Sequence, residues 1–143
     1  MDWQKNLLKS NEQIRDLLKN TKRIAVVGIK MEPFQPAFYV PNYLKSAGFE
    51  IIPVPVYYPD ATEILGEKVY RRLSEVPGEI DLVNIFRRSG DVPKHTEDIL
   101  AKKPKAVWMQ SGIYNHEVAE TLAKAGIKVV QNLCLMVEHR SLR

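Results

Sequence analysis

Short apolar runs alternate along the chain with stretches in which apolar residues recur every three or four positions. The runs are four to six residues long and mainly apolar, as strands buried on both faces of a sheet are. They cover residues 23–28, 50–54, 81–86, 105–109 and 127–130. Strands that alternate with helices predict an α/β fold, with a mainly parallel five-stranded sheet and helices on both faces in three layers.

Capping signals place the helices. Ser10 and Gln13 form a capping box, so we expect a leading helix over residues 11–20 after an N-terminal arm, 1–9. Further helices are expected from near Pro36 to Gly48, from Val92 to a point before Pro104, and between an Asn115 cap and Gly126. A short helical piece is expected at 69–76, and a short tail after residue 130.

Length and composition restrict the class of protein. The chain has 143 residues, 45% hydrophobic and 27% charged, which fits one domain spanning 1–143. Its net charge is +4, and the lysines and arginines are scattered along the chain instead of clustered, so a nucleic-acid partner is not favoured. One cysteine allows no intrachain disulfide, and no signal peptide or membrane span is evident. We therefore expect a cytoplasmic protein.

In a parallel sheet of this kind, ligands bind beyond the carboxyl ends of the strands, at the switch in strand order. The loops that follow the first four predicted strands are therefore the candidate site. They are residues 29–36, 55–58, 87–90 and 110–115.

The first of these loops begins like a dinucleotide-binding fingerprint and then departs from it. Gly28 matches the first glycine of G-x-G-x-x-G, but Lys30 and Pro33 occupy the second and third glycine positions. The second strand ends in Pro53-Val54-Pro55-Val56, without the acid that holds a ribose. An NAD(P) or FAD site is therefore disfavoured.

A phosphate site does not need that fingerprint. A helix that begins at Pro36 offers free N–H groups, and Lys30, Arg87 and Arg88 could add charge. The alternative is that Lys30 is a solvated loop lysine, the arginines are a surface pair, and Ser89 caps a helix. Composition alone does not decide between these interpretations.

The remaining loops contain few residues that could act in catalysis or recognise a ligand. Gln110 could donate to and accept from a base or an amide, whereas Trp108 is expected in the core. The Pro-rich loop after the second strand could hold adenine or be only a rigid turn. His95, His116, His139 and Cys134 form no catalytic or metal-ligating motif. We therefore expect no catalytic residue and no metal.

Several motifs in order resemble a known family. The motifs "AVVG", "ILGEKVY", "DLVNIFRRS..VP", "VWMQSGI.N" and "C...EH" are similar to those of small stand-alone CoA-binding proteins, which resemble the CoA-binding domain of the succinyl-CoA synthetase α subunit. The resemblance runs from about Ile14 to Leu142. It implies a Rossmann-like, doubly wound fold that binds coenzyme A at the strand ends.

Carried over by position, the resemblance also implies a set of binding residues. Phosphates would lie at the first loop and helix start, at Gly28, Ile29, Lys30, Pro36, Ala37 and Phe38. Pro53 and Val54 would lie beside the adenosine. The cleft would be lined by Phe86, Arg87, Arg88 and Ser89 on one side, and by Gln110, Ser111, Gly112 and Ile113 on the other. The family usually has Ser, Arg and Ser where this chain has Lys30, Gln35 and Ala37.

The resemblance implies an accessory or regulatory protein that binds CoA or an acyl-CoA and lacks catalytic groups of its own. Two alternatives stay open: a subunit of an acyl-CoA-processing enzyme, and a dinucleotide- or nucleotide-binding regulatory module. The expected partner is a small molecule, with neither nucleic acid nor membrane, and a homo-oligomer or a protein partner stays open.

Overall fold

The computed structural model describes residues 2–142 and is built around a five-stranded parallel sheet. Its strands lie in the order β2-β1-β5-β6-β7. Their bounds are β1 Arg23–Val27, β2 Glu50–Val54, β5 Leu82–Ile85, β6 Ala106–Met109 and β7 Lys128–Val130. The predicted strands are confirmed, and Met1 of the expected N-terminal arm lies outside the described residues.

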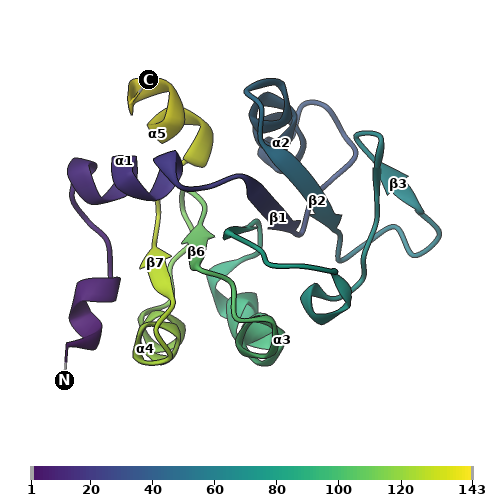
Figure 1. Cartoon of the computed structure of the whole chain (residues 1–143). Coiled ribbons are helices and arrows are strands. Elements are labelled where there is room, and N and C mark those ends of the chain that lie inside the picture. The colour runs from purple at the N-terminus through teal and green to yellow at the C-terminus, as the bar shows by residue number, and fades with distance from the viewer. Residues whose placement is uncertain (1, 143) are drawn as a thin grey trace.

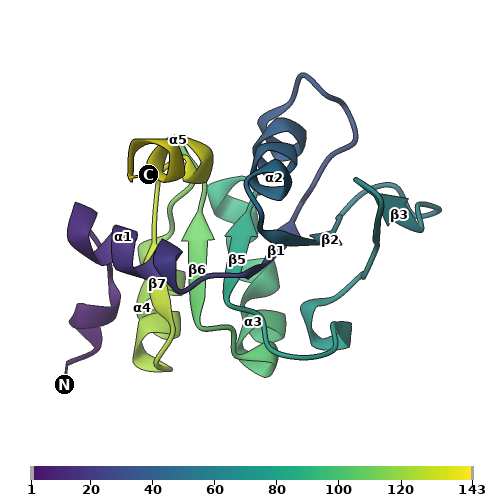
Figure 2. The ribbon, with the colours of Figure 1, turned by 45° about the horizontal axis from the view of Figure 1, so that its top comes forward.

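Helices cover both faces of the sheet (Figures 1 and 2). One face carries α1 Asn11–Lys19, α2 Pro36–Ser46 and α5 Leu135–Leu142, and the other carries α3 Thr96–Lys102 and α4 His116–Lys124. The predicted three-layer, doubly wound Rossmann-like fold is therefore confirmed. The order of strands switches between β1 and β5, because the chain leaves β1 toward β2 but leaves β5 toward β6.

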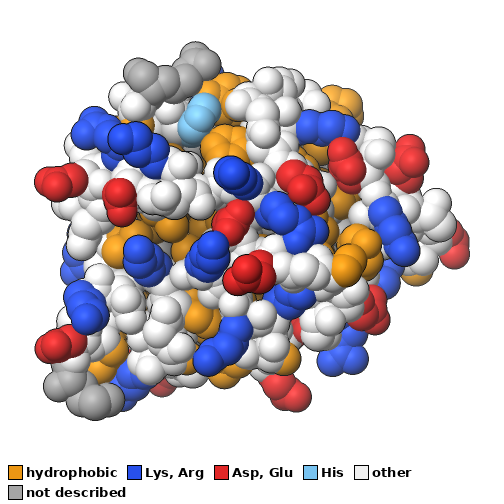
Figure 3. Space-filling model, in the orientation of Figure 1, with side chains coloured by type: hydrophobic (Ala, Val, Ile, Leu, Met, Phe, Trp, Pro, Cys, Tyr) orange, Lys and Arg blue, Asp and Glu red, His pale blue; other side chains and the backbone are white. Residues whose placement is uncertain are grey.

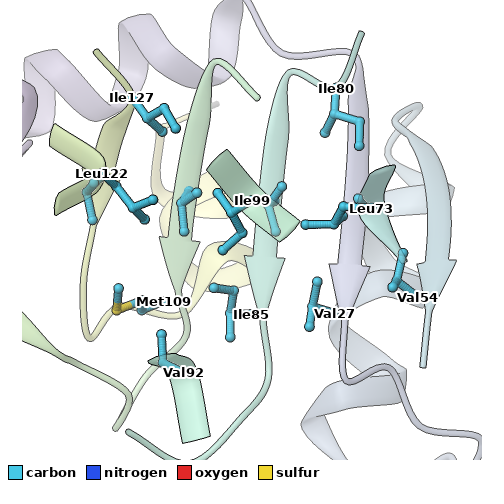
Figure 4. Packing of buried hydrophobic residues seen from close by; sticks show 14 of the residues in the cluster. Val27, Val54, Leu73, Ile80, Ile85, Val92, Ile99, Met109, Leu122 and Ile127 are labelled. Atoms are coloured by element: carbon cyan, nitrogen blue, oxygen red, sulfur yellow. The ribbon is translucent and has the colours of Figure 1, made fainter. Parts of the chain in front are cut away.

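Each strand contributes residues to two hydrophobic clusters, one on each face of the sheet, because its side chains alternate between the two faces. Val27, Ile85 and Met109 lie in one cluster with Ile99 of α3 and Leu122 of α4 (Figure 4). The other face packs α1, α2 and α5 against residues such as Ile24, Leu82 and Trp108. Trp108 is fully buried and its Nε1 donates to the Leu133 carbonyl at 2.8 Å, so the prediction of a core tryptophan is confirmed.

The prediction of a short helical piece at 69–76 was wrong. Only a 3-10 turn forms there, η2 Leu73–Glu75, because Val76 precedes Pro77 and is forced into an extended conformation. Just before it lies an unpredicted hairpin of β3 Glu63–Ile64 and β4 Glu67–Lys68.

Two further expectations need correction. The helix expected from Val92 begins only at Thr96, as α3, and is preceded by a 3-10 segment, η3 Ser89–His95, which contains Pro93. The expected short tail contains a full helix, α5. The N-terminal arm contains a further 3-10 turn, η1 Trp3–Asn6.

Strands β1 and β5 come very close where both end. Gly28 has a φ of +85°, its N–H donates to the Val54 carbonyl at 2.9 Å, and the Phe86 N–H donates to the Val27 carbonyl at 2.9 Å. A Cβ on Gly28 would lie 2.3 Å from the Phe86 carbonyl oxygen. Both the φ and the clash require glycine.

We predict that Gly28→Ala lowers the free energy of unfolding by about 3 kcal/mol or more, since left-handed strain adds to a backbone clash. Gly126→Ala is the matched control, with a φ of +87° and nothing within 4 Å of the added Cβ. It should lose only the strain, about 1–2 kcal/mol. Urea denaturation measures both, and equal losses would contradict the clash.

Candidate functional site

A cavity of about 570 Å³ opens at the carboxyl ends of β1, β5 and β6, beside the start of α2. The loops predicted from the strand ends come together around it. The residues that line it are Gly28, Lys30, Gln35, Pro36, Ala37, Tyr57, Phe86, Arg87, Arg88, Asp91, Gln110, Ser111, Gly112 and Ile113. Three of these side chains are basic and one is acidic, so the cavity suits an anion.

The residues implied by the resemblance fall into two groups. Most of them line the cavity, from Gly28 in the first loop to Ile113 in the loop after β6. Ile29, Phe38, Pro53, Val54 and Ser89 do not: Ile29 is in the core, and Val54 lines a smaller neighbouring cavity of about 240 Å³. Their role in ligand binding stays a prediction.

Ser89 is not the helix cap considered above. The residue that precedes η3 in the capping position is Arg88, which makes no side-chain cap. The Ser89 Oγ instead accepts from the Tyr114 N–H at 3.1 Å, and its carbonyl accepts from Asn115 Nδ2 at 3.3 Å. Ser89 therefore ties together the loops that follow β5 and β6.

Sequence reasoning missed Gln35, Tyr57 and Asp91 as lining residues. Gln35 directly precedes the helix start at Pro36, and Tyr57 lies in the Pro-rich loop after β2. Asp91 stands four residues after Arg87, a spacing at which helical side chains meet. All three lie in or beside the candidate loops, so the strand-end rule points to their neighbourhood but not to each position.

A proline inside α2 helps to anchor the loop after β1. Pro41 has no N–H to give to the Ala37 carbonyl, four residues earlier in the helix. That carbonyl accepts instead from the Lys30 N–H, at 3.1 Å. The loop is thus held against the start of the helix, and the Lys30 side chain is held at the cavity.

Tyr57 and Tyr58 hold the same loop from the other side. Lys30 Nζ lies 4.3 Å from the centre of the Tyr57 ring, a cation–π contact. The Tyr58 hydroxyl donates to the Glu32 carboxylate at 2.7 Å and accepts from the Met31 N–H at 3.1 Å. Burial and the bond to Glu32 raise the pKa of Tyr58, so it stays protonated and able to donate at neutral pH.

Arg87 is a largely buried charge at the cavity. Its side chain is 12% exposed, and its Nη1 is buried with no hydrogen-bond partner among the described residues. Nη2 lies 3.7 Å from Asp91 Oδ2, a long ion pair. Asp91 is bound more closely by Lys94, at 3.0 Å, and this contact with Lys94 chiefly lowers the Asp91 pKa. Arg87 therefore keeps unused capacity for an anion.

No group of three or more potential metal ligands occurs within residues 2–142. His116 begins α4, Cys134 is half-buried beside α5, and the His139 ring packs against Tyr43 and Phe49. Among the described helices, none is long and apolar enough to cross a bilayer. On the face in Figure 3, basic and acidic side chains are intermixed, as the scattered charges of the sequence indicate.

Comparison with known proteins agrees with this geometry. A family model for the CoA binding domain matches residues 22–140. The chain belongs to the CoA-binding domain family. The resemblance seen in the sequence is therefore confirmed for the family and for the fold.

Two proteins of known sequence or structure are similar to most of this chain. The uncharacterized protein YneT of Bacillus subtilis (strain 168) is 38% identical over 130 residues, 91% of this chain and 94% of that one. A solved Thermus thermophilus protein, cell-free ID.343, is 36% identical with a TM-score of 0.87, over 94% of this chain and 100% of that one.

The domain also resembles part of a larger enzyme. The dinucleotide forming acetyl-coenzyme A synthetase 1 of Ca. Korarchaeum cryptofilum, solved with phosphate and ADP, is 28% identical with a TM-score of 0.65. The match covers 84% of this chain but only 27% of that enzyme.

The anchoring of the first loop by Ala37 can be tested. In Pro41→Ala the new N–H competes for the Ala37 carbonyl, so we expect the Lys30 amide to exchange about tenfold faster. Hydrogen exchange followed by NMR measures this. Pro36→Ala is the matched control, because an N–H at the first helical turn has no intrahelical acceptor. Unchanged Lys30 exchange in Pro41→Ala would contradict the role of the proline.

His95 gives a prediction for the pH dependence of stability. Burial, and then the charge of Arg87, lower the pKa of His95 below its usual value of 6.5. Below about pH 6.5 the unfolded chain binds a proton that the folded chain does not, so the free energy of unfolding falls as the pH falls. Above that pH both states are neutral at His95 and it contributes no slope.

We expect His95→Gln to reduce the slope of stability against pH between about pH 6.5 and 5. Urea denaturation across that range measures it. Asp81 and Asp91, whose pKa values lie below 3.8, act at more acidic pH and do not interfere. The same slope in variant and wild type would show that His95 does not titrate differently on folding.

Proposed function

We propose that the protein binds coenzyme A or an acyl-CoA in this cavity, with phosphate groups at Arg87 and the start of α2. The observation that carries the proposal is the buried, unpartnered Nη1 of Arg87. An arginine cannot lose its proton, and a buried donor without a partner costs about 1–3 kcal/mol. A phosphate oxygen would supply the missing partner, with a geometry that suits a guanidinium.

The first loop supports the same position for the phosphates. The α2 helix begins at Pro36, which has no N–H, and the Phe38 N–H already donates to the Gln35 carbonyl at 2.8 Å. The Ala37 N–H is left at this end of the helix, where the helix dipole favours an anion. Lys30 lies beside it and is held there through both its backbone and its side chain. The family usually has an arginine where this chain has Gln35 and a serine where it has Ala37. Lys30 would replace these two side chains as a partner for the phosphates.

A dinucleotide fits the site less well. β2 ends in Val54, followed by Pro55 and Val56, so no carboxylate stands at that strand end to bind ribose hydroxyls. The one acid that lines the cavity is Asp91, which belongs to the β5 side and is paired with Lys94. A ligand whose ribose carries phosphate, as that of CoA does, avoids the need for such an acid.

We further infer an accessory or regulatory role rather than catalysis by this chain alone. Neither a histidine nor a cysteine lines the cavity within the described residues. Asp91, the one acid there, has a lowered pKa and is a poor general acid at neutral pH. The adenosine would lie toward Pro53, Val54 and the loop that follows β2.

Calorimetric titration tests the proposal, with CoA, NAD and ATP compared on the same sample. We expect CoA to bind most tightly, and Arg87→Gln to weaken its binding about 30- to 100-fold, because the variant removes a buried charge-assisted contact. Arg15→Gln on the exposed face of α1 is the matched control and should bind as the wild type does. A folded protein that gives no heat with millimolar CoA would exclude the proposed function.

A further inference from the structure

Gln110 stands at the end of β6 and is the most deeply buried polar side chain that lines the cavity. It is 4% exposed. A buried amide normally has its donors and acceptors satisfied, because each unpaired group costs stability. The hydrogen bonds of Gln110 account for only one end of its amide.

The oxygen end is fully used within the protein. Gln110 Oε1 accepts from the Leu135 backbone N–H at 3.3 Å and from Asn84 Nδ2 at 3.2 Å. A backbone N–H can only donate, so the atom that faces Leu135 must be the oxygen. This contact determines which way round the amide lies.

The nitrogen end is therefore the end left over. Within residues 2–142 no hydrogen bond joins Gln110 Nε2 to another protein group, although the residue lines the cavity. The Gln110 backbone does not need these donors, since its carbonyl already accepts from the Ile113 N–H at 2.8 Å. Gln110 thus offers the ligand two donors and no acceptor.

The strand order indicates which part of the ligand would lie there. β6 is next to β5 on the side away from β1, roughly 4.8 Å further across the sheet. In the proposed function, phosphates at Arg87 and the start of α2 would occupy the β1–β5 side, and the adenosine would lie beyond them toward β2. The arm on the other side of the pyrophosphate would then extend over β6.

We propose that Gln110 Nε2 recognises a carbonyl oxygen in the pantetheine arm of the ligand, either an amide carbonyl of the arm or the thioester carbonyl of an acyl-CoA. The inference rests on the proposed function. A residue built to donate discriminates against ligand portions that offer no acceptor. Gln110 is therefore a specificity-determining residue for the pantetheine portion.

The experiment compares three ligands by calorimetry: CoA, acetyl-CoA, and adenosine 3′,5′-bisphosphate, which lacks the pantetheine arm. Gln110→Glu keeps an oxygen for Leu135 and Asn84 but removes the amide donors, and Gln110→Met removes every polar atom at similar length. Gln131→Glu is the matched control: Gln131 Oε1 also accepts a backbone N–H, that of Asn115 at 2.8 Å, but Gln131 does not line the cavity. Thermal melting confirms that each variant is folded.

We expect both Gln110 variants to bind CoA about tenfold more weakly, while binding of the bisphosphate changes less than about twofold. A larger loss for acetyl-CoA than for CoA would assign the contact to the thioester carbonyl. Equal losses for the two would assign it to an amide of the arm. The Gln131 control should match the wild type throughout.

Two results would overturn the inference. Unchanged CoA binding in both Gln110 variants would show that Nε2 makes no contact. An equal loss for CoA and the bisphosphate would show that Gln110 acts only through the structure of the site. In either case the wild type still binds CoA, whereas failure of the proposed function appears as a wild type that binds none of the three.

Discussion

The close contact between the ends of β1 and β5 determines where the cavity of this protein lies. The chain leaves these neighbouring strands in opposite directions, so their loops separate and leave a cavity between them. At that point the Phe86 carbonyl occupies the position of a side chain on residue 28, and only glycine permits it. The cation of Arg87 follows directly, so the same contact that joins the strands also delivers a charge to the cavity.

Helix defects and long-range contacts complete the site. Pro41 leaves a carbonyl free inside α2, and the Lys30 N–H takes it. Gln110 contributes an oxygen to the start of α5, and Asp98 of α3 accepts from the Leu73 and Ser74 N–H groups at the start of η2. Backbone N–H and carbonyl groups that have no partner within their own helix are thus bonded by another part of the chain. These bonds fix the loops in place, although the loops have no regular secondary structure.

These long-range bonds also explain what the sequence could and could not predict. The five strands were visible because buried parallel strands are continuous apolar runs, and α1 and α4 because Ser10 and Asn115 cap them locally. The α5 helix was missed because one of its first N–H groups is bonded by Gln110, 25 residues away in the sequence. The β3–β4 hairpin was missed because its turn places Leu65, rather than Asn or Asp, at positive φ.

The candidate site, too, could be predicted from the sequence only in part. Strand ends located the loops, and the position of Arg87 after β5 was enough to place it in the cavity. Its burial and its unpartnered Nη1 could not be predicted, because they depend on which parts of the folded chain surround the side chain. Arg87 and Gln110 share one feature: each lines the cavity, and each has a side-chain nitrogen without a hydrogen bond among the described residues. Such half-used polar groups lower the stability of a protein, and the proposed ligand, which carries both phosphates and carbonyls, would offer an acceptor to each of the two residues.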